Sequence, residues 1–138
     1  AKRMNEKAVE LGALNTNFVN PNGLHDDAHV TTAYDLAMIA KYAMKNDRFR
    51  HFVTTYQYTM EATNLQETRY LYNTNRMLYD NIHTVTVNGQ VRGCKYEGVT
   101  GIKTGYTGRA GGCLVAGAKR GTTELIAVTL ASTDMGRF

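Results

Sequence analysis

The 138-residue sequence has no tryptophan, one proline, two cysteines and a single serine, Ser132. No apolar run approaches the length of a membrane-spanning helix, and no block of like charges occurs. The formal charge of +4 comes from scattered basic residues, without the interleaved aromatic and basic residues of a nucleic-acid-binding face. These absences exclude a membrane-spanning helix, and we expect no nucleic acid among the partners.

The two cysteines are too few and too far apart to match a zinc-ligand pattern. Cys94 and Cys113 flank one predicted strand, so a cross-strand disulfide is an alternative to two buried free thiols, which are commoner. The length and the apolar content of 43% fit one compact unit covering residues 1–138.

Helical patterns occupy the first part of the chain. Thr32 with Asp35 three residues later resembles a capping box, and apolar residues then recur at helical spacing. The only proline lies in a loop rich in Asn, Asp and His. We expect helices over residues 4–12 and 32–45, a short helical turn over 47–52 begun by Asp47, and a loop over 15–30.

Strand patterns dominate the rest. Asn88-Gly89 between alternating Thr and Val residues predicts a β-hairpin over 84–95. Residues 123–132 are apolar at both alternating sets of positions, which is expected when helices cover both faces of a sheet. We expect further strands over 53–60, 99–105, 112–119 and 123–132, with residues 64–81 irregular apart from one helical turn.

The residue triplet Lys103-Thr104-Gly105 carries the strongest chemical signal. On a strand, Thr104 can donate a hydrogen bond to a carboxylate while Lys103 supplies positive potential beside it. Gly105 has no side chain, so a substrate backbone can lie against the strand and pair with it. The triplet therefore predicts a strand edge that binds an anionic peptide.

Two other motifs resemble functional sites of different kinds. His25 and His29, with Asp26 between them, approximate the His-Glu-x-x-His zinc helix, but they lie in a predicted loop, and a solvated loop is favoured. Residues 98–105 contain glycines and Lys-Thr, but a phosphate-binding loop needs a glycine directly before the lysine, where Ile102 stands. His51 and His83 are isolated, and we assign them no function.

The triplet, its flanks and earlier segments together resemble the D-alanyl-D-alanine carboxypeptidases, the low-molecular-weight penicillin-binding proteins of the serine peptidase class. The resemblance implies an α+β fold, an antiparallel sheet with packed helices, as the C-terminal portion of a β-lactamase/transpeptidase-like catalytic domain that lacks its N-terminal portion. The segments that carry it, in order, are residues 20–24 (Asn-Pro-Asn-Gly-Leu), 31–37 (Thr-Thr-Ala-Tyr-Asp-Leu-Ala), 73–78 (Asn-Thr-Asn-Arg-Met-Leu) and 98–118.

By this resemblance, Lys103 and Thr104 would be catalytic residues, and Gly105, Tyr106 and Arg76 would bind substrate. Thr104 would bind the terminal carboxylate, and the backbone N–H of Tyr106 would complete the oxyanion hole. Several family members have His where Tyr106 stands, which leaves that N–H role intact. A surface or structural role for Arg76 is an equal alternative.

The family's nucleophile segment, Ser-x-x-Lys, and its Ser-x-Asn segment do not occur in this sequence. Ser132 ends an apolar strand and has no lysine three residues on. We therefore expect this chain to be inactive alone. The alternatives are a related β-lactamase or esterase-type serine hydrolase, or a non-catalytic cell-wall-binding module.

The resemblance implies no metal and no cofactor. Its implied partners are peptidoglycan stem peptides ending in D-Ala-D-Ala and β-lactams, in the extracytoplasmic envelope of a bacterium. A membrane would be reached only through segments absent from this sequence. The truncated sheet would also expose an edge at which a second copy could pair.

Overall fold

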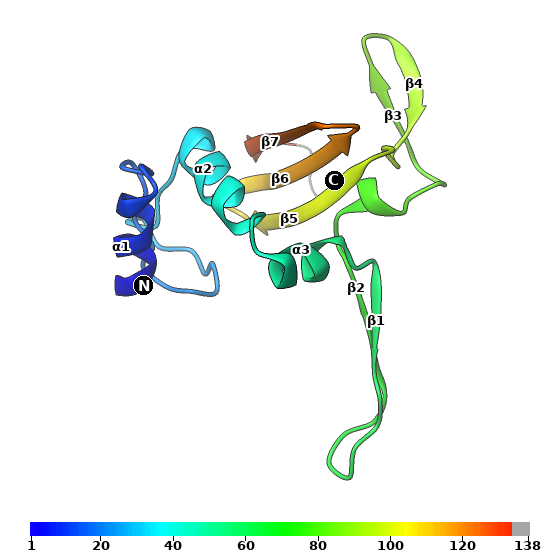
Figure 1. The fold of residues 1–138 in the computed structure, drawn as a ribbon, viewed down its shortest axis with the longest axis horizontal. Helices are drawn as coiled ribbons and strands as arrows, with labels where there is room; N and C mark the ends of the chain where they lie inside the picture. Colours follow the sequence, from blue (N-terminus) through cyan, green and yellow to red (C-terminus); the bar gives the residue numbers. More distant parts are fainter. Residues whose placement is uncertain (134–138) are drawn as a thin grey trace.

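The computed structural model describes residues 1–133, which form helices and antiparallel strands (Figure 1). This confirms the predicted α+β class. None of the described helices is long and apolar enough to cross a membrane. The elements are α1 (Lys2–Glu10), α2 (Ala33–Ala43), α3 (Asp47–Thr54), β1 (Gln57–Met60), β2 (Arg69–Tyr72), the 3-10 helix η1 (Arg76–Leu78), β3 (Thr84–Val87), β4 (Gln90–Gly93), β5 (Val99–Thr107), β6 (Gly111–Arg120) and β7 (Thr123–Ser132).

The β5-β6-β7 sheet is the centre of the fold. It is antiparallel, with Thr104 opposite Leu114 and Val115 opposite Val128. Helices α2 and α3 pack on this sheet, and their contact forms the hydrophobic core. That core consists of Ala40, Met44 and Ile102, with Phe49, Val53, Val115 and Ile126 packed against it.

The second face of β7 is exposed in the described part of the chain. Ile126 and Val128 are partly buried, whereas Leu125 and Ala127 are exposed, and Leu125 is 68% exposed. The prediction that helices cover both faces is therefore wrong for residues 1–133. Alternating apolar positions predict that a face is buried, but they do not say that the burying element lies in the same stretch of chain.

Helix α2 begins at the predicted N-cap residue, Thr32, but only half of the predicted capping box forms, because the Asp35 carboxylate bonds the preceding loop. The Asp35 backbone N–H donates to the Thr32 hydroxyl at 3.1 Å. The Asp35 side chain is buried, and its Oδ2 accepts hydrogen bonds from the Thr16 hydroxyl at 2.7 Å and the Asn15 N–H at 2.8 Å. Burial opposes ionisation, but these hydrogen bonds hold the pKa of Asp35 below its usual value. One carboxylate thus ties α2 to the loop that follows α1.

Helix α3 is longer than predicted. Its N-cap is Asn46, whose side chain accepts from the Phe49 N–H at 3.1 Å, and the helix continues to Thr54. Residues 53–54 were expected to be strand because Val and Thr favour strands, but Val53 packs against the core from the helix. Arg50 also fixes α3, because its guanidinium bonds both carboxylate oxygens of Glu124 on β7, at 2.7 and 3.3 Å.

Two hairpins project from the body on different sides (Figure 1). The β3-β4 hairpin turns at Asn88-Gly89, both with positive φ, as predicted. The β1-β2 hairpin was missed, because residues 69–72 were expected to be irregular but pair with residues 57–60. The predicted helical turn in the same stretch is confirmed as η1.

The segment that leads into η1 is fixed against neighbouring elements by two asparagines. The Asn73 side-chain amide donates to the carbonyl of Val53 at 3.1 Å and that of Thr55 at 3.2 Å. Asn75 is fully buried, and its amide donates to the Gly101 carbonyl on β5 at 2.9 Å. These bonds place residues 73–76 directly beside β5.

We predict that Asp35→Asn lowers stability at neutral pH and that the difference from wild type shrinks at acid pH. A carboxylate whose folded pKa is lowered contributes stability above its unfolded pKa, about 3.9, and loses it as the pH falls through the folded value. Thermal unfolding from pH 7 to pH 2 measures this. The exposed Glu67→Gln is the control, and a difference that stays constant with pH would contradict the prediction.

We also predict that Asn75→Ala destabilises the fold by roughly 2 kcal/mol, because it leaves the buried Gly101 carbonyl without its amide donor. Urea unfolding of this variant beside Asn64→Ala, at an exposed position, makes the measurement. Equal stability of the two variants would show that the amide does not hold the segment.

Candidate functional site

The Lys103-Thr104-Gly105 triplet lies in the second half of β5, an edge strand of the β5-β6-β7 sheet. Lys103 and Gly105 are exposed, and Thr104 is partly buried. Tyr106 follows with 54% of its surface exposed. A Cβ added at Gly105 would meet only the Cys113 Cβ at 4.0 Å, so the strand is open there to a ligand backbone.

Helix α3 packs closely against β5 just before the triplet. Gly101, two residues before Lys103, has φ +116°, and an added Cβ would lie 2.9 Å from the Val53 side chain and carbonyl. A larger residue would both adopt a rarely allowed conformation and push α3 away. Helix α3 therefore packs closely against Gly101, and the Asn75 side-chain amide donates a hydrogen bond to the carbonyl of the same residue.

The Thr104 hydroxyl has a partner that sequence reasoning did not identify. Its Oγ1 lies 2.5 Å from the Oγ1 of Thr74, and either hydroxyl can be the donor. The Lys103 ammonium donates to the Thr104 backbone carbonyl at 2.6 Å. Thr74 lies within residues 73–76 (Asn-Thr-Asn-Arg), part of the segment that resembles the family. No sequence pattern relates it to Thr104, which lies 30 residues further along the chain.

Arg76 lies on η1, next to β5, and its side chain turns toward Asp80. Its Nε is 3.7 Å from Asp80 Oδ2, which also accepts from His83 Nδ1 at 2.7 Å. The Asp80 carboxylate is buried, and hydrogen bonds from the His83 and Ile82 N–H groups hold its pKa below the usual value despite burial. Arg76 thus has an ion-pair partner in its own segment.

Ser132 lies near the end of the candidate site. It is opposite Gly112 on β6, and Gly112 is opposite Tyr106. A hollow of about 330 Å³ has Tyr106, Arg109, Gly111 and Ser132 among its lining residues. Arg109 at this hollow lies 3.3 Å from Asp27 in the exposed loop.

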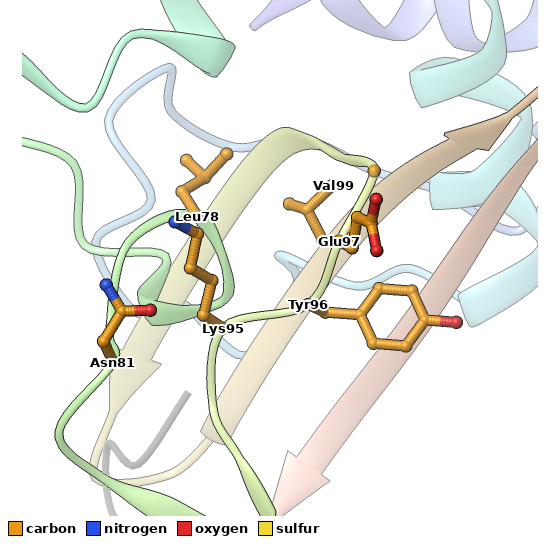
Figure 2. Close-up of a pocket in the computed structure, with 7 residues that line it drawn as sticks. Leu78, Asn81, Lys95, Tyr96, Glu97 and Val99 are labelled. Carbon is orange, nitrogen blue, oxygen red and sulfur yellow. The ribbon is translucent and has the colours of Figure 1, made fainter.

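A second hollow, of about 400 Å³, lies at the start of β5 and away from the triplet (Figure 2). The Lys95 side chain extends toward Leu78, whereas the Tyr96 ring points away from them. Arg120 stacks on the Tyr96 ring at 4.5 Å. The residues labelled there are Leu78, Asn81, Lys95, Tyr96, Glu97 and Val99, and none belongs to the predicted site.

The competing motifs have ordinary structural surroundings. His25 pairs with Asp27 at 3.2 Å, and His29 Nδ1 accepts from the Val19 N–H at 3.3 Å. No group of three or more His, Cys, Asp or Glu residues within residues 1–133 could hold a metal ion.

The phosphate-binding-loop alternative also lacks its helix, because residues 99–107 form a strand and no helix begins after Lys103. Cys94 and Cys113 are free thiols.

Comparison with known proteins gives consistent relatives. D-alanyl-D-alanine carboxypeptidase DacF of Bacillus subtilis (strain 168) is 42% identical over 138 residues, covering 99% of this chain and 31% of that protein. The D-alanyl-D-alanine carboxypeptidase of Streptomyces sp. (strain K15) is 34% identical over 144 residues, covering 96% of this chain and 42% of that protein. The chain therefore spans less than half the length of these relatives.

Solved structures agree. The Streptomyces K15 DD-transpeptidase superposes with a TM-score of 0.78 at 36% identity, covering 96% of this chain and 47% of that one. Penicillin-binding protein D2 from Listeria monocytogenes, in its cefotaxime-bound form, gives a TM-score of 0.74 at 27% identity, covering 95% of this chain and 47% of that one. The sequence profile of the D-alanyl-D-alanine carboxypeptidase family matches residues 1–134, and the chain belongs to this family.

Proposed function

We propose that this chain is the C-terminal portion of one catalytic domain of a serine-type D-Ala-D-Ala carboxypeptidase, and that it supplies one side of the active site. The observation that carries the proposal is the geometry of Lys103-Thr104-Gly105. The triplet lies on an edge strand and carries a hydroxyl at Thr104, no side chain at Gly105, and an ammonium at Lys103 that bonds the Thr104 carbonyl. That arrangement suits a peptide that ends in a carboxylate.

In the proposed reaction, a serine outside this chain attacks the carbonyl of the penultimate D-Ala. The C–N bond breaks, the last D-alanine leaves with a proton, and water then hydrolyses the acyl-enzyme. The backbone N–H of Tyr106 donates to the oxyanion, and each such donor contributes about 3 kcal/mol. Gly105 lets the peptide backbone lie against β5, and Lys103 stabilises the negative charge.

Thr104 and Arg76 are assigned to the terminal carboxylate. Thr104 donates its hydroxyl proton to a carboxylate oxygen, a charge-assisted hydrogen bond. Arg76 lies beside β5 on η1 and adds positive potential. Because the paired Asp80 charge offsets most of this potential at a distance, the contribution of Arg76 to carboxylate binding is expected to be small while that pair is intact.

The proposed partners follow from this chemistry. They are peptidoglycan stem peptides ending in D-Ala-D-Ala, and β-lactams, which also carry a carboxylate next to a reactive carbonyl. Such a substrate is found outside the cytoplasm, so we assign the protein to the bacterial envelope.

The exposed face and edge of β7 would let the isolated chain pair with a second copy. A monomeric profile in size-exclusion chromatography would argue against this pairing.

We predict that the isolated 138-residue chain is not labelled by a fluorescent penicillin and does not release D-alanine, because it lacks an activated serine. The full-length protein is expected to do both. Stoichiometric labelling of the isolated chain would contradict this. Full-length protein that deacylates penicillin rapidly would be a β-lactamase, and one that binds peptidoglycan without labelling would be a wall-binding module.

We predict that Thr104→Val in the full-length protein raises KM for a D-Ala-D-Ala peptide about tenfold or more, because a hydrogen bond to a charged group is lost. Release of D-alanine measures the effect. Thr123→Val, an exposed strand position at the opposite end of the sheet, is the matched control. An unchanged KM would remove Thr104 from the carboxylate site.

A further inference from the structure

We propose that Thr74 is a positioning residue that sets the direction of the Thr104 hydroxyl and so determines the preference for a terminal carboxylate. This inference rests on the proposed function. It is carried by the 2.5 Å separation of the two Oγ1 atoms, across 30 residues of sequence. Such a pair on an exposed strand edge is placed to act on a ligand and adds little to the hydrophobic core.

The backbone around Thr74 is held by several hydrogen bonds, although the Thr74 side chain itself is exposed. The Asn75 N–H donates to Asn73 Oδ1 at 3.0 Å, and the Met77 N–H donates to Asn75 Oδ1 at 3.1 Å. The Asn75 amide then reaches the Gly101 carbonyl at 2.9 Å. Residues on both sides of Thr74 are therefore fixed, one of them to β5 itself, so the Thr74 hydroxyl stays beside Thr104.

A hydroxyl has one proton to donate and two lone pairs that accept. When Thr74 donates to Thr104, the Thr104 oxygen is occupied as an acceptor and its own proton is directed to the ligand. Hydrogen bonds in a chain polarise one another, so the outer donor becomes stronger. The Lys103 ammonium, which bonds the Thr104 backbone carbonyl, adds positive charge at this residue and favours an anionic acceptor. Together they present a donor whose bond to a charged carboxylate is stronger than its bond to the neutral carbonyl oxygen of a terminal amide.

The test uses the full-length protein with Thr74→Val, which keeps the shape and removes the hydroxyl, and Thr74→Ser, which restores it. Thr74→Val is expected to raise KM for a peptide ending in a free D-Ala carboxylate about fivefold to tenfold, with kcat nearly unchanged. Thr74→Ser is expected to return KM to near the wild-type value. For the same peptide ending in a carboxamide, Thr74→Val should raise KM by no more than about twofold, because a neutral acceptor gains less from the donor.

A double variant separates positioning from an independent contact. Because Thr74 acts through Thr104, the KM of Thr74→Val/Thr104→Val is expected to match that of Thr104→Val alone. Thermal unfolding of each variant checks that the fold is kept, and Thr123→Val is again the matched control.

Several results would overturn the inference. These are an unchanged KM in Thr74→Val, an equal loss on the carboxylate and carboxamide peptides, no rescue by serine, or additive effects in the double variant. If the wild-type protein turns over the peptide and one of these results is found, only this inference fails. If the wild-type protein has no turnover, the proposed function fails, and the inference fails with it.

Discussion

The hydrogen bond from the buried Asn75 amide to the Gly101 carbonyl is the constraint on which the candidate site depends. It joins a turn to an edge strand at a point where α3 also packs closely, because Val53 lies against Gly101. Breaking this hydrogen bond would leave a buried amide and a buried carbonyl unpaired, which costs free energy of folding. The hydrogen bond therefore keeps the turn and the strand together. Thr74 and Thr104 meet because of this junction, and the remainder of β5 is left open to a ligand.

The core and the site occupy different halves of the same strand. Ile102 is buried against α2 and α3, and the next residue, Lys103, is exposed. The packed half therefore sets the position of the half that carries the candidate site. The Arg50–Glu124 ion pair adds a second tie between α3 and the sheet, at the far edge strand, and so limits rotation of the helix.

Much of the local structure followed from the sequence. The α2 cap at Thr32, the Asn88-Gly89 turn and the β5, β6 and β7 strands were predicted and are present. The misses have one physical cause. Residues 69–72 became β2 by pairing with β1, and Val53 became helical by packing on the core, and both outcomes depend on contacts between segments.

The sequence by itself determined the family, the order of the elements and the strand that carries Lys103, Thr104 and Gly105, because motifs, caps and tight turns depend on residues near one another in the chain. The tertiary structure alone decided that Thr74 faces Thr104 and that Arg76 pairs with Asp80. It also decided which face of β7 is covered. Hydroxyl pairs and ion pairs form across a few ångströms of space, and local sequence patterns do not encode that distance when the partners come from different elements.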